Sequence, residues 1–129
     1  SVKHNAAEDY ESPVSIKLET GEINSKKILE TLGTGIYLNN LWYLNFSDRN
    51  NARVTGLTRF GCFYVKDGEL IGPINTMRFD ETMYNIFGTK LAGLTNEQQL
   101  LMDTSTYEQR SVHSSTIPGA VVEDFRLTL

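Results

Sequence analysis

The chain has a single cysteine, Cys62, among its 129 residues. One cysteine excludes a disulfide within the chain and a CxxC metal or redox motif, and it is typical of proteins from a reducing compartment. Because free cysteines are usually buried, we expect Cys62 to be a small core residue on a strand.

Long apolar runs are also missing from the sequence. No stretch of about 18 apolar residues suggests a membrane-spanning helix. No N-terminal segment combines the charged, apolar and small residues of a secretory signal, although the chain starts abruptly at Ser1. We therefore expect a soluble cytoplasmic protein that makes no contact with a membrane.

Positive charge is scarce, since 12 lysines and arginines face 16 aspartates and glutamates and the pI is near 5.1. Binding of nucleic acid through its phosphates requires a basic surface, so we expect no nucleic-acid partner. Neither GxGxxG nor GxxxxGK followed by Ser or Thr occurs, and no alternation of strands and helices predicts a nucleotide-binding domain.

No set of catalytic residues stands out. The sequence clusters hydroxyl groups around one histidine and later supplies an acid: Ser111, His113, Ser114, Ser115 and Asp124. A Ser–His–Asp triad is assembled by the fold and not by proximity along the chain, so we predict none.

Four charged residues on predicted strands or helix ends could each have either a functional or a structural role. Asp80 and Glu81 could form a carboxylate pair for hydrolysis, but favourable charge at a helix N-terminus explains them better. Arg59 and Arg78 could bind a carboxylate, but ordinary ion pairs are the commoner role of arginines on strands.

The chain begins with signals for one strand and one short helix. Residues 14–18 alternate apolar and polar side chains, which predicts a strand with one buried face. Asn24 or Ser25 suits the cap of a short helix through residues 28–32, and Gly33 suits its end.

Residues 35–46 predict one long central strand, because apolar side chains occur at both alternating sets of positions. A strand apolar on both sides is either covered on both faces or placed at a subunit interface. We therefore take Tyr37, Leu41, Trp42 and Tyr43 as candidate interface residues. The polar residues 47–53 that follow read as a connecting loop.

A hairpin is the sharpest local signal. Residues 58–65 are rich in β-favouring side chains, and Lys66, Asp67 and Gly68 supply a turn that tolerates positive φ. Residues 69–71 would form the return strand, which Pro73 ends or confines to a sheet edge.

The second half predicts two further short helices. Asp80 suits the cap of one that ends by Gly88, and Thr95 with Gln98 has the form of a capping box that opens another through Met102. Residues 103–116 read as irregular, and residues 117–126 as the closing strand.

Together these segments predict an α+β fold, β-rich, with a mainly antiparallel sheet and a few short helices. A chain of this length buries one core and is too short for two ordinary domains. We expect residues 1–11 to be a flexible N-terminal stump or linker and residues 12–129 to be one domain.

The amino-acid sequences of several of these segments resemble those of one known family. The ordered pieces are PVSIKLETG (13–21), GIY (35–37), LWY (41–43), TGLTR (55–59), FYVKDGELIGPI (63–74) and IPGAVVEDFR (117–126). In this order they are similar to the C-terminal domain of the TldD/PmbA family, metallopeptidase-related proteins once described as modulators of DNA gyrase. The acidic charge lends no support to the gyrase description.

The resemblance implies zinc in an active parent chain or partner subunit. There the two histidines of an HExxxH helix would face the metal ion, and the glutamate would activate the metal-bound water. This chain has no HExxxH motif, so we expect no catalytic residue and no metal site within it. Family members complete the site with a cysteine near the end of this domain, a region without cysteine here. His113 is a weak candidate replacement, and a solvated loop histidine is its commoner reading.

The resemblance thus predicts a structural, substrate-channel and dimerisation domain of a TldD/PmbA-like zinc metallopeptidase or of its non-catalytic paralogue. It implies a cytoplasmic homodimer or heterodimer with a TldD/PmbA-type subunit, which acts on small or unfolded peptides. The alternative is a self-standing β-rich module that binds a protein or peptide through Trp42, Tyr43 and neighbouring aromatic side chains, without peptidase function.

Overall fold

The computed structural model describes residues 13, 15–104, 106 and 113–128. The elements in chain order are β1 (Ser15–Lys17), η1 (Ser25–Lys27), α1 (Ile28–Leu32), β2 (Gly35–Tyr37), β3 (Leu41–Asp48), β4 (Arg53–Thr58), β5 (Phe63–Lys66), β6 (Glu69–Pro73), β7 (Arg78–Thr82), η2 (Asn85–Thr89), β8 (Leu91–Met102), β9 (Ser114–Val122) and β10 (Leu127–Thr128). The predicted β-rich α+β class, with short helices only, is confirmed. The predicted N-terminal stump, residues 1–11, lies outside the described residues.

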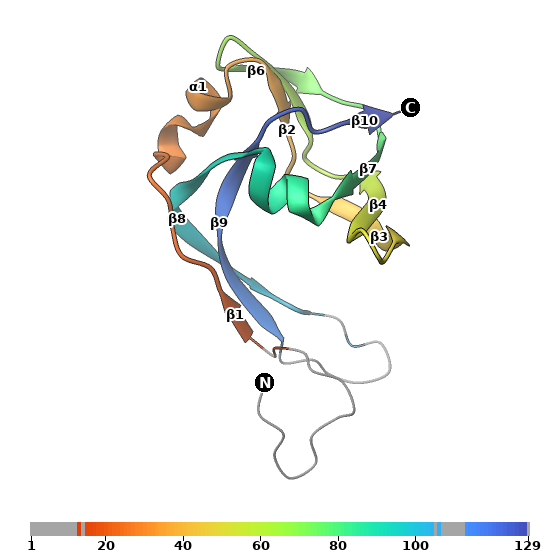
Figure 1. Ribbon diagram of the computed structural model, residues 1–129. Helices are drawn as coiled ribbons and strands as arrows, with labels where there is room; N and C mark the ends of the chain where they lie inside the picture. Colours follow the sequence, from red (N-terminus) through yellow and green to blue (C-terminus); the bar gives the residue numbers. More distant parts are fainter. Residues whose placement is uncertain (1–12, 14, 105, 107–112, 129) are drawn as a thin grey trace.

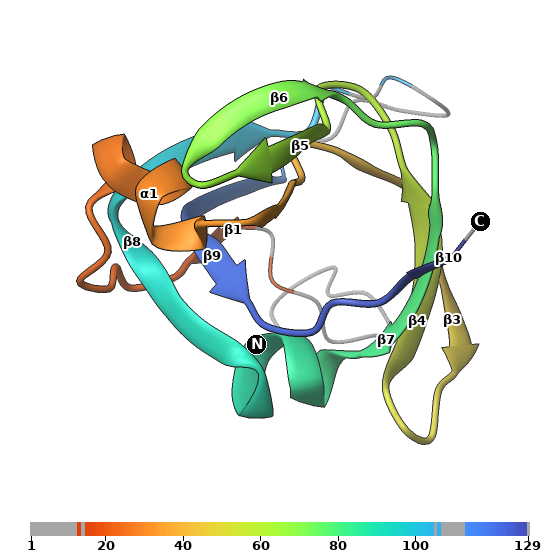
Figure 2. The same ribbon diagram turned by 90° about the horizontal axis from the view of Figure 1, so that it is seen from above.

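The strands form three sheets, in the orders β1-β9-β8, β10-β7-β4-β3 and β2-β5-β6. Every strand pair is antiparallel except β1 with β9. Figure 1 shows β8 and β9 as a long curved pair that extends away from the other two sheets and carries β1 at its lower end. Seen from above, the three sheets are arranged in a ring (Figure 2).

Two local predictions are confirmed in detail. Asn24 accepts a hydrogen bond from the Lys26 N–H at 3.0 Å and so caps η1, the turn that leads directly into α1, while α1 itself has no side-chain cap. Gly33 ends α1 with φ +66°. Asp67 and Gly68 join β5 to β6 with φ values of +52° and +81°, the left-handed pair that a tight hairpin turn requires. Pro73 lies at the end of β6, an edge strand, where a missing donor costs no ladder bond.

The prediction of one strand over 35–46 is wrong. β2 ends at Tyr37 and pairs with β5, whereas β3 begins at Leu41 and pairs with β4 in another sheet. The predicted strand over 58–65 is divided in the same way, because the chain leaves β4 after Thr58 and enters β5 at Phe63. Between β2 and β5 the chain thus changes sheets twice, at 38–40 and at 59–62.

These two crossings contact each other. The Arg59 N–H donates to the Asn40 carbonyl oxygen at 3.1 Å, and the Cys62 thiol lies 3.6 Å from the same oxygen. Cys62 is 2% exposed, so its predicted burial is confirmed, although it precedes β5 and is not on a strand.

Both helices predicted in the second half need correction. Asp80 caps nothing, because it lies within β7 opposite Thr55, and the helical turn begins only at Met83 and continues as the π-helix η2. Thr95, taken as a helix cap, lies within the twelve-residue strand β8, so no helix runs to Met102. Pairing with β9 outweighs the local capping pattern there.

The ends of two predicted segments shift. Strand β3 runs to Asp48 and β4 starts at Arg53, which leaves a four-residue turn in place of the longer predicted loop. The predicted closing strand over 117–126 holds the second part of β9 and then a turn at Asp124 with φ +48°, and β10 begins only after it. Half of the segment predicted to be irregular, 103–116, lies outside the described residues, and β9 already begins at Ser114.

The core of the described chain is small. Its buried apolar side chains are Cys62, Val65 and Phe79, with Phe79 packed on Phe125 at 5.2 Å between ring centroids. Large apolar side chains are exposed on β3, β6, β8 and η2. No helix in the part of the chain that the structure describes is long and apolar enough to cross a membrane.

Candidate functional site

The predicted interface residues are divided between two sheets. Tyr37 ends β2 and is half-buried, whereas Leu41, Trp42 and Tyr43 open β3. Trp42 is 49% exposed and Tyr43 is 68% exposed. The expected cover on both faces of this segment is absent within the described chain, since Leu44 and Phe46 are exposed as well.

Strand β3 is the edge of its sheet. One side pairs with β4, and no described strand pairs with the other side. Its sequence, LWYLNFSD, contains neither lysine nor proline, the residues with which proteins most often protect an edge from other chains. Its exposed backbone groups and apolar side chains therefore suit the addition of another strand.

A bulge shapes the start of this strand. Trp42 pairs with Leu57 and Asn45 with Thr55, so β3 carries one more residue than β4 between these pairs. Tyr43 lies within this bulge and adopts a positive φ of +53°. The rings of Trp42 and Tyr43 then meet edge to face, with centroids 5.9 Å apart and planes at 88°.

Arg59 adds a positive charge beside this aromatic surface. Its guanidinium carbon lies 5.6 Å from the Trp42 ring centroid and 5.2 Å from the Phe60 ring centroid. The side chain is exposed. Within the described ranges it belongs to none of the ion pairs, so the ordinary ion pair favoured from the sequence is not formed there.

The groups considered for catalysis are not brought together. Within residues 15–104, 106 and 113–128, no three His, Cys, Asp or Glu side chains form a group that suits a metal ion. The described residues therefore offer no ligand set for a metal ion. The backbone carbonyl of His113 accepts a hydrogen bond from the Asp103 N–H at 2.9 Å, and its role as a metal ligand remains a prediction. Ser111 lies outside the described residues.

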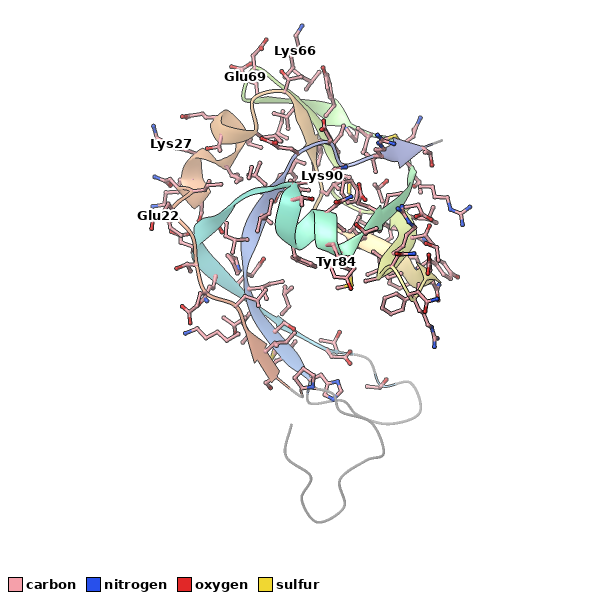
Figure 3. All side chains as sticks on the ribbon, in the orientation of Figure 1. Glu22, Lys27, Lys66, Glu69, Tyr84 and Lys90 are labelled. Atoms are coloured by element: carbon pink, nitrogen blue, oxygen red, sulfur yellow. The ribbon has the colours of Figure 1, made fainter. Side chains whose placement is uncertain are left out.

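A polar cluster that the sequence did not predict lies at η2. Glu81, read as charge at a helix N-terminus, is instead 4% exposed on β7. One carboxylate oxygen accepts from the Thr82 N–H and the Asn85 amide, both at 2.8 Å, and the other lies 2.9 Å from Lys90 Nζ. Lys90 and Tyr84 mark the two ends of this helical segment (Figure 3).

These contacts set the charge state of Glu81. Burial by itself raises the pKa of the carboxyl group, but the hydrogen bonds from Lys90, Asn85 and Thr82 lower the pKa to about 2. Lys90 also donates to the Asp124 carbonyl oxygen at 3.1 Å. The cluster thus joins β7, η2 and the turn after β9, a structural role.

A cavity of about 670 Å³ lies between the α1–β2 segment and the C-terminal strands. Its lining is mostly aliphatic, with Ile23, Leu32, Ile36, Leu38 and Val121 among the residues. Its polar lining residues are Thr31, Thr34, Glu123 and Asp124. The exposed edge formed by β3, Arg59 and Phe60 is the better candidate site.

Comparison with known proteins bears on the fold and the family. Residues 4–129 match the family model described as "PmbA/TldA metallopeptidase C-terminal domain". The crystal structure of TldE from Thermococcus kodakarensis superposes with a TM-score of 0.68 at 15% sequence identity, over 88% of this chain. This chain spans 23% of the length of that TldE chain. No curated protein sequence matches significantly.

Proposed function

Because the chain belongs to the TldD/PmbA family as its metallopeptidase C-terminal domain, we propose that it is a non-catalytic docking domain of a peptidase assembly. It holds an extended peptide, forms part of the substrate channel and contacts a second TldD/PmbA-type subunit. Hydrolysis takes place at a zinc site that another part of the parent chain or the partner subunit supplies. The proposed substrates are small or unfolded peptides, and the proposed location is the cytoplasm.

The observation that carries this proposal is the edge strand β3. Eight residues long, it offers unpaired backbone groups on one side and exposed apolar side chains on both faces. A peptide that adds to such an edge gains main-chain hydrogen bonds, which select an extended conformation and demand little sequence. This kind of recognition suits unfolded substrates of varied sequence.

The same surface supports the proposed subunit contact. Aromatic residues are enriched in protein interfaces, and apolar patches of this kind on a soluble protein mark interaction sites. Leu41, Trp42 and Tyr43 on β3 and Tyr37 on β2 remain the predicted contact residues. The assembly is a homodimer or a heterodimer of two TldD/PmbA-type chains.

The test compares two edge strands in the full-length protein. The double variant Tyr43→Lys and Phe46→Lys places charge on β3, at side chains that are 68% and 54% exposed. The matched control, Leu70→Lys with Ile71→Lys, changes side chains on edge strand β6 that are 51% and 58% exposed. Both pairs lie on the surface, so the free energy of folding should change little.

Binding of fluorescent unfolded peptides is measured by anisotropy, and assembly by sedimentation velocity. We expect the β3 variant to lose at least tenfold in peptide affinity and to sediment as a smaller species, and the β6 variant to match the wild type. Equal behaviour of the two variants would reject the proposal. A monomeric chain of residues 1–129 that binds its partner at full affinity would favour the self-standing module instead.

A further inference from the structure

We propose that Arg59 binds the C-terminal carboxylate of an extended peptide that adds antiparallel to β3, and so fixes the direction in which peptides lie on this edge. The inference rests on the proposed function, and it names the group of the peptide that the site recognises.

The first support is the state of the Arg59 side chain. The rings of Trp42 and Phe60 hold its guanidinium group at 5.6 and 5.2 Å from their centroids. Stacking on aromatic faces leaves the N–H groups at the rim of the guanidinium plane available to a carboxylate. No described carboxylate pairs with Arg59, so its charge is available to an anionic ligand.

The second support is the position of Arg59 along the edge. Thr58 pairs with Leu41, the first residue of β3, and the next residue, Arg59, is bonded through its N–H to the Asn40 carbonyl oxygen. Arg59 therefore lies at the end where β3 begins. A strand that runs antiparallel to β3 finishes at this end, so its terminal carboxylate meets Arg59.

The charge at the other end of β3, near Asp48, is compatible with an antiparallel peptide. Asp48 ends β3, Arg49 follows it, and Arg53 pairs with Asp80 at 3.1 Å. Two acids and two arginines leave that end close to neutral. A parallel peptide would instead place its terminal ammonium group beside Arg59, where like charges repel. The charge at Arg59 thus favours the antiparallel direction.

The length of β3 sets the size of the ligand. Strand β3 has eight residues, but its bulges let the six residues of β4 span the same length, so a peptide of six to eight residues covers the edge from Asp48 to Arg59, which is roughly 20–27 Å at about 3.4 Å per residue. Guanidinium and carboxylate groups match in a two-bond geometry. The site therefore combines sequence-tolerant backbone pairing with recognition of a free chain end.

The experiment uses the full-length protein and pairs of fluorescent octapeptides that share one neutral sequence and end in a free acid or an amide. For the wild type we expect about tenfold tighter binding of the acid, the factor that corresponds to one charge-assisted pair. Arg59→Gln should abolish this preference, so that the acid and the amide bind with equal affinity. Arg59→Lys should retain part of the preference, because the charge remains.

Arg126→Gln is the matched control, because Arg126 is another exposed arginine, located beyond β9. It should leave the tenfold preference unchanged. Acetylation of the peptide N-terminus should also have no effect, since that end lies beside the nearly neutral end of β3. Loss of the preference in both arginine variants would overturn the inference, because the effect would then reflect overall charge.

The remaining outcomes separate this inference from the proposed function. Equal binding of acid and amide, with binding still weakened by the β3 lysines, overturns the role of Arg59 and leaves the docking domain in place. Absence of binding for both peptides overturns both proposals. Amide peptides with an internal glutamate that bind as tightly as the free acid overturn the terminal carboxylate as the ligand. If the wild type binds neither peptide but self-associates, and Arg59→Gln loses this self-association, the occupant of the β3 edge is a second copy of the protein.

Discussion

The ammonium group of Lys90 lies 2.9 Å from a carboxylate oxygen of Glu81, in an ion pair whose acidic side chain is 5% exposed. The pair joins the end of β7 to the residue before β8, and Lys90 also donates to the Asp124 carbonyl oxygen. Surface ion pairs contribute little to stability, but loss of one partner from a buried pair leaves the other without compensation.

We therefore predict that Glu81→Gln lowers the free energy of unfolding by about 2 kcal/mol, because it removes charge-assisted hydrogen bonds from a buried group. Urea denaturation measures this change. The control is Asp80→Asn on the same strand, which breaks an ion pair with Arg53 whose side chains are 41% and 45% exposed. It should cost less than about 0.5 kcal/mol, and equal losses in the two variants would contradict the prediction.

The stability that Glu81 contributes should depend on pH. Its ordinary pKa of 4.5 is lowered to about 2 in the folded chain. A lowered pKa stabilises the fold fully above the ordinary value, and this stabilisation disappears as the pH falls toward 2. The difference in unfolding free energy between wild type and Glu81→Gln should thus be constant above about pH 5 and shrink below it. A difference that stays constant down to pH 2.5 would argue against the assignment.

Signals contained within a few residues were sufficient to predict structure. Asn24 caps η1, Gly33 ends α1, and Asp67 with Gly68 forms the hairpin turn, because each acts on its own backbone or on the next turn of chain. The β-rich class also followed from the sequence. These features need no knowledge of distant partners.

Features that depend on distant pairing were not predictable. The pattern over 35–46 contains no sign that Tyr37 pairs with Phe63 while Leu41 pairs with Thr58, and these pairings divide the segment between two sheets. Thr95 and Gln98, which have the form of a capping box, are equally compatible with a strand once β9 pairs with β8. Local propensity gives way to tertiary context in both cases.

The candidate site was predictable in part. Trp42 and Tyr43 were singled out as aromatic residues, and Arg59 as a possible carboxylate ligand, but their proximity results from the pairing of β3 with β4. The Glu81–Lys90 pair was missed, since the two are nine positions apart with a π-helix between them. No regular helical spacing brings such positions together.

Thr95 offers a further test, because its hydroxyl group takes the place of a ladder bond. The hydroxyl oxygen accepts from the Gly119 N–H at 2.8 Å and donates to the Glu97 carbonyl oxygen at 2.9 Å, at a bulge where β8 has extra residues. Thr95→Val keeps the shape but removes both hydrogen bonds of a residue that is 5% exposed, so we expect urea denaturation to show a loss of about 2 kcal/mol in unfolding free energy.

Thr95→Ser keeps the hydroxyl group. In urea denaturation it should recover most of the stability that Thr95→Val loses. Thr89→Val is a matched control, because the Thr89 hydroxyl donates to the Asn85 side chain at 2.8 Å on the exposed surface. It should change stability by less than about 0.5 kcal/mol. A serine variant as unstable as the valine variant would show that the methyl group, and not the hydroxyl, matters.

The turn between β5 and β6 should be sensitive to a single methyl group at Gly68. Its φ of +81° is unfavourable for any residue with a side chain, and an added Cβ would lie 3.2 Å from the Glu30 Cα of α1. Gly68→Ala should therefore destabilise the fold by about 1–2 kcal/mol, from backbone strain and from displacement of α1. Asp67→Asn at the neighbouring position, where φ is +52°, should be neutral or slightly stabilising because asparagine tolerates this conformation. If Gly68→Ala and Asp67→Asn unfold at the same urea concentration, the turn does not have the left-handed geometry on which this prediction depends.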